Sequence, residues 1–350
     1  MLAPVIHILP LTLIRRERVL PVPGRILVRK GQKVGANDVV VEAKLYPEHL
    51  LLDIAVGLGV LRSQTERHIQ VKLGDQLAEG DIVAGPVGFG RRVVRAPRNC
   101  QVILVGSDQV LLELIEQPFQ VKAGMSGEVV ELITDRGAII ETTGALVQGV
   151  WGNGRVDYGM MTVLAKEPEQ ALMPEQFDVS MRGAIVMAAV CENMVSLHAA
   201  QELSIRGLIL ACMSIDLKPV AARMEYPIIL LEGFGNRGMN SLAFKLLSTS
   251  ERREVSINAQ EWNLYEGKRP EIVIPLPSDG EISQPHDAVK FSQNLLVRVV
   301  RAPHAGKVGR LVRMCGSVTF TNGISALAAE VQLEDGDPAL LPLANLEVIA

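Results

Sequence analysis

The sequence predicts a multidomain α+β protein. At 350 residues the chain is too long for one compact core of ordinary size, so two to four domains are expected. The residue pattern changes along the chain. Short valine-rich runs closed by glycine come first, and apolar runs alternating with helical patterns follow. A strongly basic strand, turn and strand come last. We therefore expect an all-β region over residues 1–160, a small parallel α/β domain over 181–261 and a further β domain over 288–350. Proline- and glutamate-rich stretches predict linkers over 161–180 and 262–287.

Overall composition limits the classes of function. The net charge is -4, so affinity for phosphate groups has to come from a local patch. Aromatic residues make up only 4% of the chain, which argues against a surface of stacked rings for single-stranded nucleic acid. The cysteines show no C-x-x-C spacing, so they specify neither a zinc site nor a disulfide framework, and reduced thiols in a cytoplasmic protein are expected. They are Cys100, Cys191, Cys212 and Cys315.

The apolar N-terminus is predicted to be a strand that enters the first domain. In a secretory signal the positive charge precedes the apolar run, whereas here Arg15 and Arg16 follow it and Pro4 and Pro10 interrupt it. Residues 2–14 are also too few to span a bilayer, and no later segment reaches about 18 uninterrupted apolar residues. We expect no membrane partner.

Residues 18–160 contain repeated phrases that suggest a particular β fold. V-R-K-G-Q-K-V at residues 28–34 returns as V-K-L-G-D-Q-L-A-E-G-D at residues 71–81, each phrase ending a strand in a tight glycine turn. This alternation resembles the barrel-sandwich hybrid fold of lipoyl and biotinyl domains. In those families an exposed hairpin lysine carries the cofactor, but Lys44 lacks the flanking M-K-M or D-K-A pattern. We expect Lys44 to be an ordinary surface lysine and predict no bound cofactor.

The β region ends in a glycine-dense loop, Gly152-Asn153-Gly154-Arg155. Such glycines allow positive φ and let the backbone approach a phosphate or simply another strand. Tight barrel turns are the commoner cause, and both interpretations stay open. Arg155, like the pair Arg91 and Arg92, is a candidate anion contact.

Residues 181–261 show the alternation that is typical of a parallel α/β domain, because continuous apolar runs fit strands buried on both faces. The interruption over 262–287 contains Ile272-Val273-Ile274, which is predicted to add a strand to a neighbouring sheet. The expected strands are 183–190, 208–213, 227–231 and 254–259, and the expected helices are 193–204, 217–224 and 241–250.

Two local motifs in this domain suggest phosphate chemistry. Gly233, Gly235 and Gly238, with Arg237 between them, form a literal G-x-G-x-x-G, which in a Rossmann unit seats a pyrophosphate on a helix N-terminus. It follows the third strand rather than the first, so a plain glycine-rich loop is favoured. The segment S-L-H-A-A around His198 resembles the histidine loop of phosphohistidine swivelling domains, but Leu197 separates the serine from the histidine. We therefore expect a helix-face histidine in a swivelling-like topology.

The basic stretch near the C-terminus is the best functional clue. Residues 288–329 contain no Asp or Glu and six Lys or Arg, and β-branched runs flank a turn built on Pro303, Gly306 and Gly309. The segment V-R-A-P-H-A-G-K-V-G-R-L-V resembles a KOW motif, the SH3-like barrel unit of bacterial transcription elongation factors and some ribosomal proteins. That resemblance implies contact with nucleic acid or a ribonucleoprotein. The candidate contact residues are Arg298, Arg301, His304, Lys307, Arg310 and Arg313.

The chain carries no catalytic signature. H-E-x-x-H, G-x-S-x-G and a Walker loop are all missing, and no metal site is predicted. We therefore expect a cytoplasmic, non-enzymatic adaptor whose KOW-like domain contacts RNA, DNA or a machine acting on them. Two alternatives stay open: a scaffold that contacts proteins only, and a dinucleotide- or phosphate-binding enzyme that uses the loop from Gly233 to Gly238. The oligomeric state is not predicted.

Overall fold

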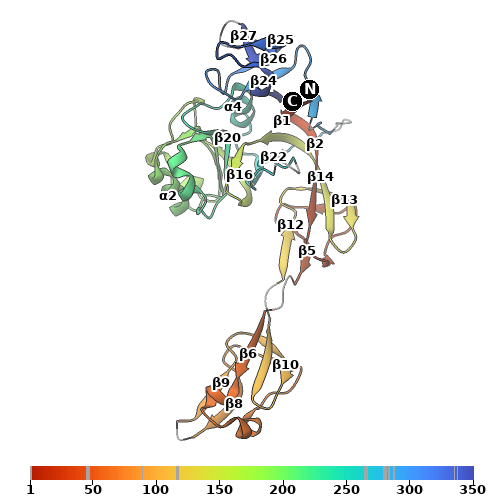
Figure 1. Ribbon diagram of the computed structural model, residues 1–350, viewed down its shortest axis with the longest axis vertical. Coiled ribbons are helices and arrows are strands. Elements are labelled where there is room, and N and C mark those ends of the chain that lie inside the picture. The colour runs from red at the N-terminus through yellow and green to blue at the C-terminus, as the bar shows by residue number, and fades with distance from the viewer. Residues whose placement is uncertain are drawn as a thin grey trace.

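The computed structural model shows an elongated protein built mostly of β-strands (Figure 1). It describes residues 2–44, 48–88, 90–115, 118–263, 267–278, 282, 284–286, 288–334, 336 and 338–350. Strands account for 47% of the residues and helices for 13%, so sheets decide the architecture. Within the described ranges, no helix has the length and apolar character needed to cross a membrane.

A twelve-stranded sheet forms the centre of the molecule and contains a parallel part. Strands β16, β17, β19 and β20 run parallel, and β19 is buried along its whole length. Helices α2 and α3 pack on one face and α4 on the other, which explains why these strands are continuously apolar. The elements are β15 (Trp151–Gly152), β16 (Val156–Val163), β17 (Ile185–Met187), β18 (Val190–Cys191), α2 (Met194–Glu202), β19 (Gly207–Met213), α3 (Lys218–Ala221), β20 (Ile228–Phe234), α4 (Ser241–Ser248), β21 (Glu254–Asn258) and β22 (Glu271–Pro275).

The run expected as one strand over 183–190 forms two short strands, β17 and β18, which both pair with β19. The other strands and helices expected over residues 183–259 are present, with one difference in direction. The last of them, β21, runs antiparallel to β16 instead of extending the parallel set. It also pairs antiparallel with β22, so it marks the place where the parallel part of the sheet passes into an antiparallel part. The expectation that Ile272-Val273-Ile274 adds a strand is confirmed, because β22 lies between β21 and β14 (Gly137–Gln148).

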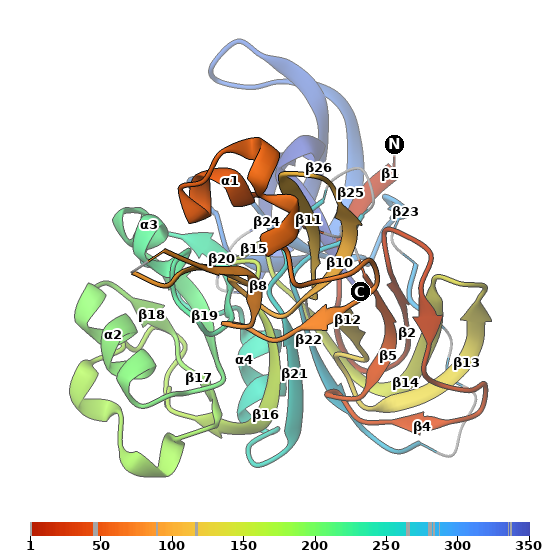
Figure 2. The same cartoon turned by 90° about the horizontal axis from the view of Figure 1, so that it is seen from below.

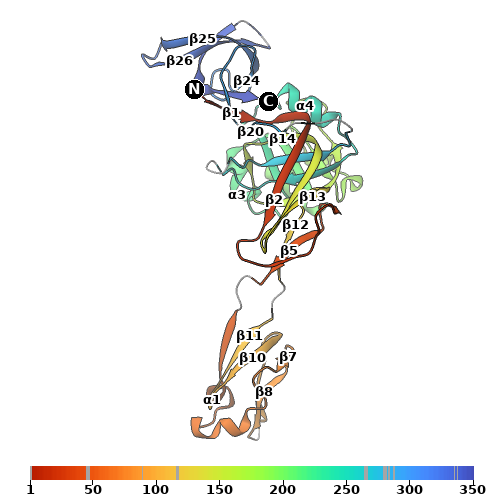
Figure 3. The ribbon, with the colours of Figure 1, turned by 90° about the vertical axis from the view of Figure 1, so that its right-hand side faces the viewer.

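Strand β14 joins the centre to a β-rich unit that we call the proximal unit. It pairs with β2 from Gly137 opposite Val19 to Val147 opposite Ile8, forming the long ribbon seen in Figure 3. A separate core including Ile14, Val40 and Ile140 lies under this ribbon. The strands of the unit are β2 (Ile8–Val19), β3 (Arg25–Ile26), β4 (Lys33–Val34), β5 (Val39–Ala43), β12 (Phe119–Lys122), β13 (Gly127–Ile133) and β14.

A second β-rich unit, the distal unit, is inserted between β5 and β12 and projects away from the rest of the molecule (Figure 1). It has its own core around Ile54, Val102 and Leu112. Its elements are β6 (His49–Asp53), α1 (Ile54–Leu58), β7 (Gln76–Leu77), β8 (Ile82–Val87), β9 (Arg92–Arg95), β10 (Cys100–Val105) and β11 (Gln109–Leu114).

The phrase repeated in the sequence forms the same turn in both units. In the proximal unit the N–H of Gly31 donates to the carbonyl of Val129, and the N–H of Val129 donates to the carbonyl of Gln32. The distal unit repeats this reciprocal pair, and the glycine has positive φ in each case, a conformation that favours glycine. The matching residues there are Gly74, Val102 and Asp75.

A seven-stranded sheet closes the other end of the molecule around a core that includes Val297, Leu311 and Val348. The antiparallel strands β24 and β25 confirm the strand, turn and strand expected there. Gly309 lies within β25, where a Cβ atom would come within 2.5 Å of the carbonyl oxygen of Gln332. The strands are β23 (Ala288–Lys290), β24 (Leu296–Val299), β25 (Val308–Thr319), β26 (Ser325–Leu333), β27 (Pro338–Pro342) and β28 (Leu346–Ile349), together with β1 (Leu2–Ile6).

The first strand of the chain belongs to this C-terminal sheet, not to the proximal unit as expected. Strand β1 pairs parallel with β28 and antiparallel with β23. Ala3 and Val5 enter the C-terminal core, whereas Ile6 and Ile8 enter the core of the central sheet. The apolar N-terminal run therefore contributes side chains first to the C-terminal core and then to the central core. Its composition does not reveal that two cores are involved.

Candidate functional site

The six candidate contact residues of the basic stretch lie in different environments. Arg301, Lys307, Arg310 and Arg313 are exposed, the first two on the turn between β24 and β25 and the other two on β25. His304, also on the turn, is half-buried. The sixth, Arg298, is buried.

Arg298 is not available to a phosphate or to a partner surface, which corrects its assignment as a contact residue. Its side chain is only 4% exposed. Nη1 donates to the carbonyl of Leu231 at 3.0 Å and to Oε2 of Glu232 at 3.1 Å. Nη2 donates to Oε2 of Glu347 at 2.6 Å. Arg298 therefore connects the C-terminal sheet to β20 of the central sheet, two elements that lie next to each other in Figure 1.

Both carboxylates that surround Arg298 are needed to keep its charge buried. Burial by itself would lower the pKa of the guanidinium group, but the nearby charges of Glu232 and Glu347 outweigh that effect and raise the pKa above its usual value. The guanidinium group is therefore cationic at neutral pH. A buried charge of this kind stays tolerable only while its partners are present.

The exposed arginines of β25 are held much more loosely. Arg313 donates through Nε to Glu330 at 2.5 Å, on the facing strand β26, and this hydrogen bond raises the pKa of Arg313. The side chain of Arg313 is 66% exposed, so solvent screens the pair. Arg310 donates to the carbonyl of Asn294 at 3.3 Å. Both cationic groups still face solvent.

The ion pairs of Arg298 belong to a larger cluster at the boundary between the two sheets. Arg269 donates to the other carboxylate oxygen of Glu347, and its guanidinium carbon lies 4.1 Å from the ring centre of Trp262. The cluster forms one wall of a cleft of about 650 Å³, which we call the arginine cleft. The lining residues are Pro4, Val150, Glu232, Arg237, Trp262, Arg269, Arg298, Val299, Val300, Arg301, Leu346 and Glu347.

The arginine cleft has more positive than negative charge, with four arginines against two glutamates. Arg269 and Arg298 are paired with the glutamates. Within the described part of the chain, Arg237 and Arg301 form no ion pair with a carboxylate, although Arg237 donates to the carbonyl of Glu232 at 2.9 Å. Their charges therefore remain uncompensated at the edge of the cleft.

The loop from Gly233 to Gly238 does not form the pyrophosphate seat of a Rossmann unit. Helix α4 begins at Ser241, beyond the last glycine of the motif, and its N-terminus is closed by its own cap, since Asn240 accepts from the N–H of Ala243 at 2.9 Å. Asn240 in turn donates through Nδ2 to Glu232 at 2.6 Å. A carboxylate thus occupies the region in which a pyrophosphate would lie, and like charges repel.

The glycines of that loop have packing roles. A Cβ atom on Gly238 would come within 2.5 Å of the side chain of Glu169 and 3.1 Å of the carbonyl of Pro168. Gly235 has positive φ and donates to the carbonyl of Met213 at 2.9 Å. The loop nevertheless contributes Arg237 to the arginine cleft, so one of its four candidate residues takes part in a cationic site.

The glycine-dense loop at residues 152–155 is likewise a structural element, because its polar groups are used inside the chain. Asn153 donates to the carbonyls of Ala221 and Tyr226 and accepts from the N–H of Ile228. Gly152 approaches Ala259 so closely that a Cβ atom would lie 2.2 Å from its carbonyl oxygen, and Gly154 donates to that same oxygen. Of the four predicted anion contacts in this loop, only the exposed Arg155 retains a side chain facing solvent.

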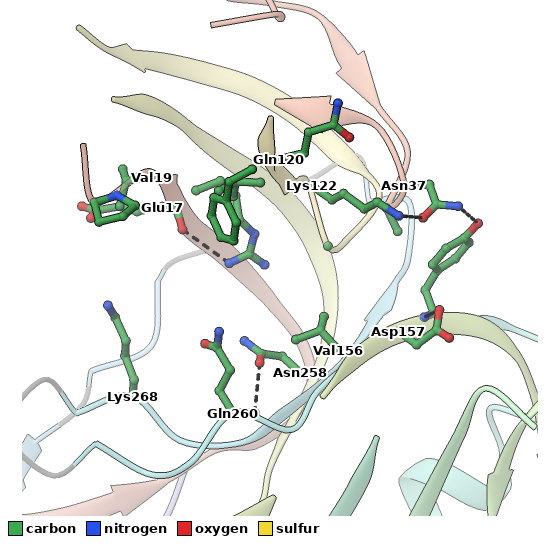
Figure 4. Close-up of a pocket in the computed structure, with 17 residues that line it drawn as sticks. Glu17, Val19, Asn37, Gln120, Lys122, Val156, Asp157, Asn258, Gln260 and Lys268 are labelled. Atoms are coloured by element: carbon green, nitrogen blue, oxygen red, sulfur yellow. Dashed lines mark hydrogen bonds between the residues drawn. The ribbon is translucent and has the colours of Figure 1, made fainter. Parts of the chain in front are cut away.

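A second cleft, of about 660 Å³, lies between the proximal unit and the central sheet (Figure 4). On one side Lys122 donates to Asn37 at 3.2 Å, and Asn37 donates to the hydroxyl of Tyr158 at 2.8 Å. Gln260 and Lys268 lie on the opposite side. Three cationic and two acidic side chains line this cleft, and Lys122, Asn37 and Tyr158 bond to one another, so it resembles a polar boundary between units more than a ligand site.

Two other residues considered from the sequence are ordinary surface groups. Lys44 is exposed at the end of β5, where the chain leaves for the distal unit. His198 lies on the exposed face of α2, as expected for a helix-face histidine. The neighbouring Ser196 is buried and donates to the carbonyl of Leu172 at 2.9 Å.

Several residues of the arginine cleft were missed in the sequence. Trp262 and Arg269 fall in the stretch expected to be a linker, and Glu232 lies inside an apolar strand. Two local signals were present: the charge of Glu232 within an apolar run, and Trp262, one of the two tryptophans of the chain, in a proline-rich segment. A buried glutamate is seldom unpaired, so Glu232 implied a cationic partner but not which one.

Comparison of the whole chain with protein-family models and with curated proteins gave no match.

Proposed function

We propose that the protein is a non-enzymatic adaptor whose C-terminal sheet contacts nucleic acid or a ribonucleoprotein through the exposed cations of the turn and of β25. The observation that carries this proposal is that the acid-free stretch over residues 288–329 keeps Arg301, Lys307, Arg310 and Arg313 exposed while its apolar residues fill a core. Exposed Lys and Arg side chains bind phosphates and release counterions, which gives affinity without strong dependence on sequence.

The finer assignment of the fold is part of the same proposal. We regard the C-terminal sheet as a KOW-like, SH3-like barrel, and the proximal and distal units as barrel-sandwich hybrids of the lipoyl and biotinyl type. The turn repeated at Gly31 and Gly74 favours a common fold for the two units. The parallel strands of the central sheet favour a swivelling-like domain. The distal unit leaves the proximal one directly after Lys44, so a carrier role for this lysine is not part of the proposal.

Binding to a protein partner is the second candidate, and a specific feature favours it. The hairpin of β25 and β26 projects from the molecule (Figure 2) and exposes large apolar side chains. Exposed apolar groups on a projecting hairpin are typical of protein contacts. They are Val312, Met314, Ile324 and Leu327.

The test is filter binding of RNA and DNA oligonucleotides to the full chain, at about 50 mM and about 200 mM salt. A triple variant with Lys307, Arg310 and Arg313 changed to alanine is compared with the wild type. Removing three phosphate contacts is expected to reduce the slope of log affinity against log salt by about 2 to 3.

A matched control removes the same charge elsewhere, through Lys30→Ala, Arg67→Ala and Lys72→Ala, which are exposed residues of the proximal and distal units. The control is expected to retain both affinity and slope. Equal retention of wild type and first triple variant at low salt would exclude the nucleic-acid proposal and leave the protein partner as the better candidate.

A further inference from the structure

We propose that the arginine cleft binds a phosphate monoester joined to a planar aromatic ring, such as one nucleoside monophosphate unit. This site shares Arg301 with the exposed cations of the turn but includes neither Arg310 nor Arg313 of β25, and its charge and lining argue for it without the function proposed above. The ligand's source is either a free nucleotide or the 5′-phosphorylated end of a nucleic acid, which share this chemistry.

The charge of the cleft indicates the phosphate. Glu232 and Glu347 neutralise Arg298 and Arg269, whereas Arg237 and Arg301 have no carboxylate partner within the described residues. A phosphate monoester carries nearly two negative charges at neutral pH and accepts several hydrogen bonds from guanidinium groups. It would balance the two uncompensated arginines.

An unsatisfied buried donor points the same way. Arg269 is 9% exposed, and its Nη1 is the one guanidinium nitrogen in the cleft that is fully buried without a hydrogen-bond partner in the described structure. Buried polar groups are nearly always paired in proteins, so an orphaned donor beside a cleft marks a place for an acceptor from outside the chain.

The walls of the cleft indicate the aromatic part of the ligand. Trp262 is 40% exposed and lines the cleft, with the guanidinium group of Arg269 stacked 4.1 Å from its ring centre. Apolar side chains, among them Val150 and Leu346, complete the lining. A volume of about 650 Å³ lies within the range of small-molecule sites, and a tryptophan beside arginines suits a nucleobase that stacks while its phosphate is held by charge.

The test uses fluorescence titration and calorimetry on the full chain with AMP, adenosine and inorganic phosphate as probes. AMP is expected to bind and to quench Trp262, whereas adenosine binds about tenfold or more weakly, since it lacks the charge-assisted hydrogen bonds. Arg237→Ala and Arg301→Ala are each expected to weaken AMP binding about tenfold. Trp262→Leu should abolish the quenching, because Trp151, the other tryptophan, packs against Phe234 outside the lining of the cleft. It should also weaken binding about tenfold, because the nucleobase loses its stacking partner.

Arg310→Ala is the matched control, because it removes an exposed arginine that does not line the cleft, and it should leave AMP affinity unchanged. Circular dichroism and thermal unfolding show whether each variant is folded. An Arg301→Lys variant, which keeps the charge at an exposed position, should recover part of the affinity.

Separate arms distinguish the two sources of the ligand. Quenching of Trp262 by a 5′-phosphorylated oligonucleotide, but not by its 5′-hydroxyl counterpart or by AMP, assigns the site to nucleic-acid ends, and quenching by AMP assigns it to free nucleotides. The proposal is overturned if neither AMP nor the 5′-phosphorylated oligonucleotide quenches Trp262. It is also overturned if adenosine binds as tightly as AMP, or if Arg237→Ala and Arg301→Ala both leave affinity unchanged.

Discussion

Arg298 and Arg310 come from the same basic stretch and lie on adjacent, paired strands, yet Arg298 is buried in ion pairs and Arg310 is exposed to solvent. Arg298 points into the boundary between two sheets and is enclosed by Glu232 and Glu347. Arg310 is exposed to solvent, and its one side-chain hydrogen bond among the described residues goes to the carbonyl of Asn294. The difference shows that position relative to a neighbouring unit, and not the charge of the stretch, decides whether a cation holds the fold together or faces a partner.

The largest expected effect is the loss of stability in Arg298→Ala. Removing this cation leaves Glu232 and Glu347 buried without one of their partners, so the free energy of unfolding should fall by about 3–5 kcal/mol. Urea unfolding followed by circular dichroism measures it. Arg310→Ala, in contrast, should change the free energy of unfolding by no more than about 0.5 kcal/mol. If both variants lost a similar free energy of unfolding, Arg298 would not contribute more to stability than Arg310.

A double-mutant cycle measures the coupling energy between Arg298 and Glu232, and the expected effect is smaller. Arg298→Met and Glu232→Gln are measured singly and together, and the double variant should be less destabilised than the sum of the singles by about 0.5–3 kcal/mol. The physical reason is that the second substitution removes a group that the first one left without its partner. Additive effects would mean that the two side chains are not energetically coupled, despite their 3.1 Å separation.

The smallest expected effect concerns the exposed pair of Arg313 and Glu330. Because Arg313 lies largely in solvent, Arg313→Ala should lower the thermal midpoint only slightly at low salt and not at all at high salt, where screening removes the attraction. Differential scanning calorimetry at both salt concentrations checks this. A large loss that persists at high salt would place Arg313 with Arg298 among the residues that hold the fold.

Much of the secondary structure could be predicted because its signals are local. The continuous apolar run of β19, the cap residue Asn240 before α4 and the glycine turns at Gly31 and Gly74 each act within a few residues. The strand at Ile272–Ile274 was also visible in a stretch otherwise rich in turn residues. Its partners β14 and β21 were not, because they lie far away in sequence.

The candidate sites were predicted less well than the secondary structure, because a glycine motif does not reveal which group its backbone approaches. Gly152 accommodates the carbonyl of Ala259 and Gly238 accommodates Glu169 and Pro168, where a phosphate had been considered. The arginine cleft was not foreseen as a site. Its residues come from several separate segments between Pro4 and Glu347, and Trp262 and Arg269 follow no recognisable spacing.

Alternation of polar and apolar residues, turn glycines and cap residues determined by themselves that this chain forms many short strands with a few helices, since those preferences act between near neighbours. Only the tertiary structure decided that β1 completes the C-terminal sheet, that the distal unit is inserted into the proximal one, and that Arg298 is enclosed by two carboxylates. Each of these outcomes depends on contacts between distant segments. Burial is a property of such contacts, so an arginine's sequence neighbours cannot tell whether its charge will face solvent or a glutamate.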